Sequence, residues 1–254
     1  MPTHIHGKDS AVLFDGFDLT AYFNSVDTSA NLETAETTAF GNSAKTYLPG
    51  LSDGSVSLAG MWDAGTGSSD AVLEDALAAT TTPVVSIHMG GPAIGSSAII
   101  TRADEVDYSI SSPIADVAQI SASLTCTAEN DTDQTLALSS SAVQLTTGAA
   151  AAVSGFPAAG ASVDNAASSA LGGMAVFHIT QNSGNGTNYL CKVQHSANDS
   201  SWADLITFSV VEDAVLGSGF ATCSGTVNRY TRAIISTTGG SSGTITYTVN
   251  FARF

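Results

Sequence analysis

The chain has 254 residues, enough for one large or two small domains, and 43% of them are hydrophobic while only 12% are charged. Seven lysines and arginines stand against 23 acidic residues, so the formal net charge is -16. Proteins that grip nucleic acid neutralise phosphates with basic side chains, and anionic membranes attract basic segments. This charge therefore argues against tight nucleic-acid binding and against membrane attachment.

The first apolar segment predicts a β-hairpin. Residues 12–14 and 17–23 flank Asp15-Gly16, and an Asp-Gly pair between apolar runs favours a two-residue hairpin turn. Residues 24–49 then form a long polar run with few side chains to bury. Such a run inside a compact domain is usually a working loop or disorder, and we predict a loop here.

Two turns and a strand are expected after this loop. Proline fixes φ and glycine tolerates positive φ, so Pro49-Gly50 and Asp53-Gly54 predict turns. Apolar residues then alternate through residues 56–62, which indicates a β-strand.

One helix is predicted, over residues 70–79. Ser68 or Ser69 can cap its N-terminus. Residues 80–83 end it, because β-branched residues and the position before a proline disfavour helix. The predicted apolar stripe is Leu73, Ala76 and Leu77. A single short helix among strands is expected to pack across a sheet or close the end of a barrel.

Strands are predicted for most of the remaining chain. In the first half they cover residues 84–89, 98–102, 106–110 and 114–127. The composition then becomes rich in Ala, Gly and Ser over residues 146–170, and we place a domain boundary between residues 132 and 133. The second domain, 133–254, has clean alternation at 175–179, 189–195, 202–208, 229–235 and 244–251. These short strands predict an antiparallel β-sandwich.

The sequence offers few residues arranged for catalysis. His4 and His6 lie at the terminus, and His88 and His178 are single histidines on strands, predicted to be surface or half-buried rings. His195 lies near Ser196 and Asp199, but no GxSxG nucleophile turn and no glycine-rich phosphate motif is present. We therefore expect no enzyme, no cofactor and no metal site.

The cysteines and the apolar segments restrict the protein class further. Cys126, Cys191 and Cys223 are odd in number and widely spaced, so they are predicted to be small buried hydrophobic residues, with a Cys191–Cys223 bridge left open. No run approaches about 20 apolar residues, and the N-terminus lacks the apolar core of a signal peptide.

Two stretches resemble the tail tube (major tail) proteins of long-tailed bacteriophages. The first leads from Thr37-Thr-Ala-Phe40 through Lys45-Thr-Tyr-Leu-Pro-Gly-Leu51 to residues 56–62 and the acidic helix. The second resembles a β-sandwich module of tail proteins. It contains Val193-Gln-His-Ser196, Trp202, Gly225-Thr-Val-Asn-Arg-Tyr230, Arg232 and Phe251-Ala-Arg253, with Asn198-Asp-Ser200 where the module usually has Asp-Gly.

This resemblance implies a mainly β fold, with a tube-forming β-barrel or sandwich and one flanking helix in residues 1–132. The C-terminal sandwich would decorate the outside of a non-contractile tail. Hexameric rings of the chain would stack into a tube that conducts DNA during ejection, in a virion tail assembled from protein made in the bacterial host cytoplasm. Further partners would be the tape-measure protein and the tail terminator and tip proteins.

The resemblance also implies that the polar loop bridges subunits or rings. Its candidate self-assembly residues are Leu32, Glu33, Glu36, Thr37, Thr38, Phe40, Lys45 and Tyr47. An acidic lumen would repel the DNA backbone and let it slide, which the net charge of the chain motivates.

Two other functions remain open on the sequence. A virion surface decoration protein or carbohydrate-binding adhesin would explain the sandwich, with Trp202 and Tyr189 as a sugar-stacking platform. An extracellular hydrolase would need a nucleophile constellation that the sequence does not contain.

Overall fold

The computed structural model describes residues 5–91, 93–127, 138–146, 149–151, 161–183, 188–212, 214–238 and 244–254. Across these ranges the chain is mainly antiparallel β-structure with one α-helix, which confirms the predicted fold class. It divides into unit 1 (Met1–Ala21, Pro83–Thr101 and Ser139–Phe254) and unit 2 (Tyr22–Thr82 and Arg102–Leu138). The boundary predicted between residues 132 and 133 lies outside the described residues.

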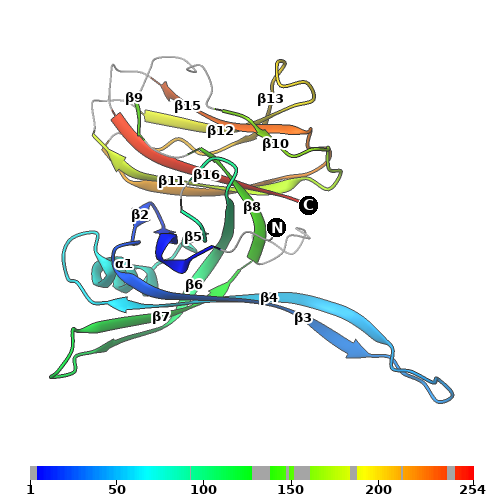
Figure 1. Ribbon diagram of the computed structural model, residues 1–254, viewed down its shortest axis with the longest axis horizontal. Helices are drawn as coiled ribbons and strands as arrows, with labels where there is room; N and C mark the ends of the chain where they lie inside the picture. The colour runs from blue at the N-terminus through cyan, green and yellow to red at the C-terminus, as the bar shows by residue number, and fades with distance from the viewer. Residues whose placement is uncertain are drawn as a thin grey trace. The chain divides into compact units, whose positions relative to one another are not determined.

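Unit 2 is built on a four-stranded antiparallel sheet in the order β3-β4-β7-β6 (Figure 1). Its strands are β3 (Phe23–Glu36), β4 (Tyr47–Met61), β7 (Gln119–Cys126) and the part of β6 (Ser97–Ser111) from Arg102 onward. The two strands predicted at 98–102 and 106–110 are thus one strand, with a register shift between Glu105 and Asp107 that marks a bulge. The strand predicted from residue 114 begins only at Gln119.

One face of this sheet carries the apolar core of unit 2. Side chains alternate along a strand, so every second residue points to the same face. The buried set on this face is Val56, Leu58, Ala103, Ile120, Ala122 and Leu124. Helix α1 (Ser69–Leu77) contacts β7 and adds the buried side chains of Val72 and Leu73. Full burial of each large aliphatic side chain stabilises the fold by roughly 1.5–3 kcal/mol.

The start of α1 differs in detail from the prediction. Ser68 occupies the N-cap position, but its hydroxyl donates to the carbonyl oxygens of Asp63 and Gly65 and does not cap the helix. The Ser69 hydroxyl donates to the Met61 carbonyl at 2.9 Å, which ties the helix to the end of β4. The predicted stripe is correct only at Leu73, because Leu77 is exposed.

Unit 1 contains the predicted sandwich. One sheet has the order β14 (Gly217–Cys223), β11 (Gly173–Asn182), β16 (Thr244–Arg253), β8 (Leu138–Thr146), the start of β6, β5 (Val84–His88), β1 (Ala11–Phe14) and β2 (Phe17–Asp18). The second has the order β10 (Val163–Asp164), β15 (Tyr230–Thr238), β12 (Asn188–Ser196) and β13 (Ala203–Thr207). β9 (Ala149–Ala151) pairs with β16, and a 3-10 helix, η1, spans Gly7–Asp9.

The sandwich core lies between these two sheets. Phe177 of the first sheet meets Phe208 with ring centroids 4.7 Å apart and planes tilted by 59°. Gly219 is required beside it, since a Cβ there would lie 2.2 Å from the Phe177 ring. Cys191 is buried in this core, and all three cysteines are free, so the open Cys191–Cys223 bridge is not formed.

The other face of β11 and β16 is also covered, which corrects the prediction for two histidines. His88 and His178 are both fully buried, where the sequence predicted surface or half-buried rings. They belong to a buried polar network: His88 Nε2 lies 3.0 Å from Asn250 Oδ1, and Asn250 Nδ2 donates to Ser86 Oγ at 3.1 Å. The covering strands come from distant parts of the chain, so local alternation could not reveal the burial.

The turn between β1 and β2 is the one that Asp-Gly predicts. Asp15 and Gly16 both have positive φ, 46° and 89°, as a type I′ turn requires. The Gly16 N–H donates to His178 Nδ1 at 3.2 Å, so this turn also fixes the orientation of a buried imidazole ring.

Candidate functional site: the hairpin arm and the serine-rich face

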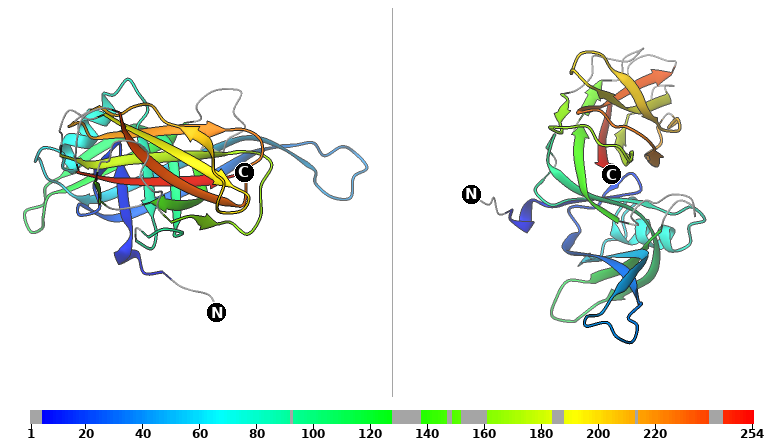
Figure 2. Two further views of the ribbon diagram at one scale, coloured as in Figure 1. Left: turned by 90° about the horizontal axis from the view of Figure 1, so that it is seen from above. Right: turned by 90° about the vertical axis from the view of Figure 1, so that its right-hand side faces the viewer.

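β3 and β4 continue together beyond the rest of their sheet. They pair from Phe23 opposite Gly60 to Glu36 opposite Tyr47, whereas β7 pairs with β4 only from Ser55 to Met61. Residues 30–54 therefore form a two-stranded arm, about 25 Å long at about 3.3 Å per residue. Figure 1 shows the arm extending past the other strands of unit 2, and the left view of Figure 2 shows it from a second direction.

The predicted polar loop and its two turns are therefore wrong. Apart from Gly54 at its base, the arm is exposed on both faces, so its strands lack the buried alternate positions that predict a strand. Pro49 and Gly50 lie within β4 where its only partner is β3, and there a residue without an N–H is tolerated. Gly54 also lies in β4, and a Cβ on it would come within 3.2 Å of Cys126 and Leu138.

Hydrogen bonds order the end of the arm, which we call the tip (residues 37–46). The Thr37 N–H donates to the Thr46 carbonyl at 2.8 Å, and the Thr46 N–H donates to Thr38 Oγ1 at 3.0 Å. Lys45 Nζ pairs with Glu36 at 2.9 Å, and this cation lowers the pKa of the Glu36 carboxyl. The structure thus brings four of the predicted assembly residues together at the base of the tip.

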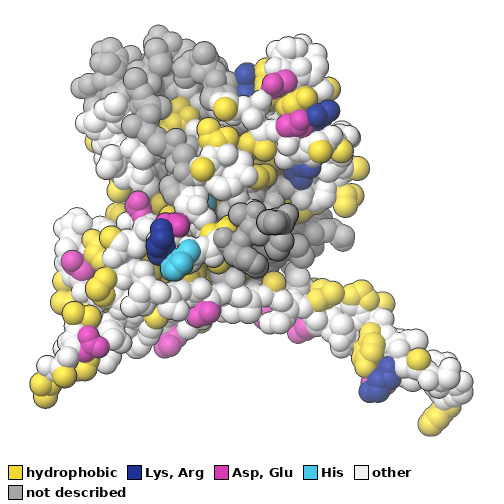
Figure 3. Space-filling model, viewed as in Figure 1, with side chains coloured by type: hydrophobic (Ala, Val, Ile, Leu, Met, Phe, Trp, Pro, Cys, Tyr) yellow, Lys and Arg dark blue, Asp and Glu magenta, His cyan; other side chains and the backbone are white. Residues whose placement is uncertain are grey.

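Large apolar side chains are exposed along the arm. Phe40 at the tip is 110% exposed relative to its reference state, and Leu51 is 77% exposed. The full set is Leu32, Phe40, Tyr47, Leu48 and Leu51, and Figure 3 shows hydrophobic side chains along this arm. A lone two-stranded hairpin is marginally stable in water, and clustered exposed apolar groups mark interaction sites. The arm is therefore the strongest candidate contact surface.

The sequence prediction named most but not all of these residues. Leu32, Phe40 and Tyr47 are exposed as an assembly contact requires, and Glu33 is an exposed charge between them. Leu48 and Leu51 were missed because their neighbours, Pro49 and Gly50, were interpreted as a turn. The close spacing of Tyr47, Leu48 and Leu51 within a polar segment could have indicated them.

The face of the sheet opposite the core of unit 2 is dominated by serine. Its exposed or half-exposed positions include Ser25, Asp27, Ser29, Ser55, Ser57, Asp107, Ser109, Ser111, Gln119, Ser121, Ser123 and Thr125. Cross-strand hydroxyl pairs join the strands: Ser29 with Ser55, and Ser109 with Ser121, both at 2.8 Å. We call this surface the serine-rich face.

The serine-rich face carries mainly negative charge. Its charged residues are Asp27, Asp104, which pairs with Thr125, and Asp107, and the half-exposed Arg102 lies on the same side of β6 two residues before Asp104. A shallow hollow of about 290 Å³ near Asn24, Ser109 and Ser121 is lined by uncharged groups. The basic residues of unit 2 are Lys45, on the arm, and Arg102. A surface of small hydroxyls and carboxylates with one arginine at its edge is well hydrated but gives phosphate groups few cations to bind.

A buried carboxyl group lies on the core side of the same sheet. Glu105 is only 7% exposed, and neither of its oxygens has a hydrogen-bond partner. Burial, with a contribution from Asp107, raises the pKa of Glu105 to about 8. Nearby, Tyr108 donates its phenolic hydrogen to Asp70 of α1 and so links the helix to β6. No cluster of potential metal ligands is found within the residues that the structure describes.

The buried histidine network does not have the chemistry of a hydrolase. The Gly16 N–H donates to His178 Nδ1, so this nitrogen carries no proton in the neutral ring. The ring proton is therefore on Nε2, which donates to Ser86 Oγ at 3.0 Å. In that tautomer the ring cannot accept the serine proton. Burial and the neighbouring His88 lower the pKa of His178 to about 3, and Ser86 is inaccessible to solvent.

The residues around His195, where the sequence predicted no catalytic site, are bonded as follows. His195 Nδ1 accepts the Asn228 N–H at 3.2 Å, and the Ser196 hydroxyl donates to Asn198 Oδ1 at 3.0 Å. These bonds shape the turn after β12. Neither residue is arranged as a nucleophile and base pair.

The outer face of the sandwich has a polar ladder and one stacked tryptophan. The Arg232 guanidinium lies 4.0 Å from the ring centroid of Trp202 and also donates to Gln194, which in turn donates to Asp204. The proposed platform of Trp202 and Tyr189 is wrong, because Tyr189 is only 1% exposed and lies in the sandwich core.

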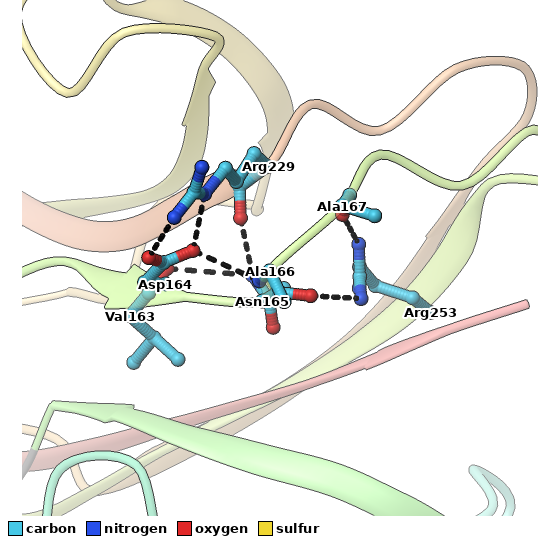
Figure 4. Close-up of polar contacts among 7 residues, drawn as sticks. All are labelled: Val163, Asp164, Asn165, Ala166, Ala167, Arg229 and Arg253. Atoms are coloured by element: carbon cyan, nitrogen blue, oxygen red, sulfur yellow. Dashed lines mark hydrogen bonds and ion pairs between the residues drawn. The ribbon is translucent and has the colours of Figure 1, made fainter.

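Two arginines form hydrogen bonds with residues 164–167, which comprise the end of β10 and the turn after it (Figure 4). Arg229 donates through two nitrogens to the carboxylate of Asp164, with both distances 2.6 Å. Arg253 donates to the carbonyls of Ala167 and Asn165 at 2.6 and 3.3 Å. The arginine at Asp164 holds the pKa of that carboxyl near 2. Arg229 and Arg253, two residues of the stretch that resembles the tail module, therefore hold β10 and the turn after it against the rest of the sandwich.

Comparisons with known proteins give matches at the level of structure. No protein-family model and no curated protein matches the sequence. Similar solved structures include a chain from the virion of a native gene transfer agent particle, with a TM-score of 0.41, 20% identity, and coverage of 48% of this chain and 93% of that chain. A chain from the tail of an empty gene transfer agent particle, refined with C6 symmetry, has a TM-score of 0.41, 15% identity and the same two coverages.

A third similar structure is the SPP1 tail tube. Its TM-score is 0.40 at 17% identity, and the match covers 48% of this chain and 75% of that chain. Separately, among the residues described, no helix is both long enough and apolar enough to cross a membrane.

Proposed function

We propose that the chain is a structural protein of a virion tail whose copies assemble through unit 2 into a tail tube. The observation that carries the proposal is the arm. It is ordered by its own hydrogen bonds, yet it presents Phe40, Leu48 and Leu51 to solvent. Such a hairpin gains stability only when a partner covers it. In a self-assembling protein that partner is another copy of the chain.

The sheet edges of unit 2 support assembly into rings. Among the described residues of unit 2, β3 pairs only with β4 and β6 pairs only with β7, so within these residues both outer strands have an unpaired edge. Open edges promote pairing with another chain. Joining β3 of one copy to β6 of the next would close a ring, proposed to be hexameric, and stacking of rings would give the tube.

The serine-rich face is proposed to line the lumen. DNA passing through a tail must not bind its wall, and this face offers hydroxyls with Asp27, Asp104 and Asp107 and has a single arginine, Arg102, at its edge toward the start of β6. The tape-measure protein would occupy the same lumen before ejection, and terminator and tip proteins would contact the ends of the tube.

The sandwich in residues 133–254 is proposed to decorate the outside of a non-contractile tail. An external domain of this size would crowd a contractile sheath. The protein would be made in the cytoplasm of the bacterial host and would end in the virion tail.

Electron microscopy of the purified protein tests this proposal. The wild-type chain is expected to form tubes or six-fold rings, and a variant lacking residues 32–45 is expected to stay folded but unassembled. Circular dichroism with an unchanged β-sheet spectrum confirms that the shortened variant folds. Wild-type protein that gives only compact single particles at high concentration would contradict the assembly proposal. Tubes of normal yield from the deletion variant would contradict the role of the arm.

A further inference from the structure

A second exposed apolar surface lies at the end of the sheet opposite the arm. β4 ends at Met61 and β6 ends at Ser111, and both are paired with Gln119 at the start of β7. The exposed large side chains at this end are Met61, Trp62, Ile110, Ile114 and Val117, which we call the far-end patch. Figure 1 shows the β6–β7 hairpin at this end of unit 2, and Figure 3 shows hydrophobic side chains there.

We propose that the tip of the arm of one copy binds the far-end patch of a second copy. This inference rests on the proposed self-assembly and identifies the surface that receives the arm. The two most exposed members, Phe40 of the tip at 110% and Ile114 of the patch at 109%, would cover one another. Burial of such groups is the main driving force of association.

The geometry of the sheet requires two copies for this contact. β4 runs from the arm to the far-end patch through 15 residues, which span about 50 Å at about 3.3 Å per residue. A paired strand cannot bend back over that length, so the tip cannot reach the patch of its own chain. A contact between different surfaces of identical copies is head-to-tail, and repetition of a contact that does not close builds a filament.

The charges of the two surfaces are complementary. Lys45 is the only charged residue of the tip; it pairs with Glu36 of β3 at 2.9 Å, and its side chain is still 65% exposed. The far end carries Asp63 and Asp116, while residues 61–69 and 110–119 contain no lysine or arginine. In a chain with a net charge of -16, most surfaces repel one another. An exposed lysine that shares its charge between Glu36 and a carboxylate of the far end is a combination that this chain offers for self-contact.

Photocrosslinking from the tip tests the contact directly. Phe40 is replaced by p-benzoylphenylalanine, and assembled protein made from equal amounts of ¹⁴N- and ¹⁵N-labelled chains is irradiated and digested. The expected products are mixed-isotope crosslinks from position 40 to peptides that contain residues 61–63 or 110–118. Crosslinks that map to unit 1, to another arm, or within a single chain would overturn the inference.

Substitutions give a second, independent test. Ile114→Ser combined with Val117→Ser is expected to raise the critical concentration for assembly about tenfold, because two apolar side chains no longer lose their water contact on assembly. Leu171→Ser is the matched control, since Leu171 is 74% exposed but lies in unit 1. Equal assembly of the Ile114/Val117 variant and the control would contradict the inference.

Reversing the charges of Lys45 and Asp116 tests whether the tip and the far-end patch lie against one another. Lys45→Glu and Asp116→Lys are each expected to raise the critical concentration about two- to fivefold, and the double variant is expected to recover most of the loss. Lys8→Glu, at an exposed lysine of unit 1, serves as the control. Absence of recovery in the double variant would count against the pairing.

These tests separate the two proposals. If the wild-type chain forms neither rings nor tubes, the proposed function fails. If tubes form but position 40 crosslinks elsewhere, only the receiving surface is wrong.

Discussion

His178 and Ser86 are joined inside unit 1 by a hydrogen bond of 3.0 Å between Nε2 and Oγ. Asn250 donates to the same hydroxyl, and His88 contacts Asn250, so two imidazole rings share one buried network. Burial lowers the pKa of both histidines, that of His178 to about 3. The network is therefore stable with neutral rings, and protonation of either ring in the folded chain is costly.

Acidification is expected to destabilise unit 1. A histidine whose pKa is lower in the folded than in the unfolded chain contributes stability above pH 6.5, and this stability is lost as the pH falls from 6.5 toward 3. The expected loss from His178 is about 1.4 kcal/mol per pH unit, and the lowered pKa of His88 acts in the same direction. Urea unfolding between pH 7 and pH 4, followed by the fluorescence of Trp202, measures it. His178→Gln is expected to reduce the slope; equal slopes in the wild type and the variant would contradict the assignment.

Glu105 is expected to destabilise unit 2 at alkaline pH. Its pKa is raised to about 8 in the folded chain, so stability falls as the pH rises from about 4.5 to 8. Glu105→Met, which removes the buried carboxyl, is expected to stabilise unit 2 by roughly 2 kcal/mol at pH 8 and by little at pH 4.5. The fluorescence of Trp62 in a Trp202→Phe background reports this unit. Asp104→Asn, at an exposed neighbour, is the matched control; a gain of the same size there would rule out burial as the cause.

Ala166 is expected to be a site of backbone strain. Its φ is 64°, in the left-handed region that alanine disfavours, and it follows the residues that Arg229 and Arg253 hold. Ala166→Gly is expected to stabilise the chain by about 0.5–1 kcal/mol. Ala167→Gly is the control, because Ala167 does not have positive φ. That substitution only raises the backbone entropy of the unfolded chain, so it should not stabilise the protein. Thermal unfolding compares the two, and a loss of stability in Ala166→Gly would contradict the interpretation.

The apolar side chains of the arm are expected to affect assembly but not folding. Leu32→Ser, Leu48→Ser and Leu51→Ser together change only exposed positions, so the melting temperature of the unassembled chain should stay the same. Sedimentation should show that tubes are lost. Val210→Ser and Val215→Ser, also at exposed positions, provide a control that should assemble normally. A triple variant that pellets as the wild type does would show that the arm is not a contact.

The serine-rich face is expected to become enclosed on assembly. Ser57→Cys and Ser121→Cys should react with a bulky polyethylene-glycol maleimide in the unassembled chain and be protected in tubes. A small maleimide should react in both states. Ser201→Cys, in an exposed turn of the sandwich, should react with the bulky reagent in both. Rapid labelling of position 121 in intact tubes would place this face on the outside.

The sequence by itself determined the features that depend on neighbouring residues. Asp15-Gly16 forms the predicted hairpin turn because its positive φ values suit those residue types. Phe177 and Ile179 face the sandwich core, as period-two alternation predicts, because one face of that sheet meets a second sheet. The shortage of basic residues is equally a property of the sequence, and it persists as the uncharged and acidic surface of the serine-rich face.

Only the tertiary structure decided the features that depend on distant residues. His178 is buried because strands from residues up to 162 positions away cover its side of the sheet. Gly54 is explained by the close approach of Cys126 and Leu138 and not by a turn. The arm escaped prediction for the opposite reason: neither of its faces is buried within the chain, so no alternation marks it. A strand with two exposed faces leaves no period-two pattern in its sequence.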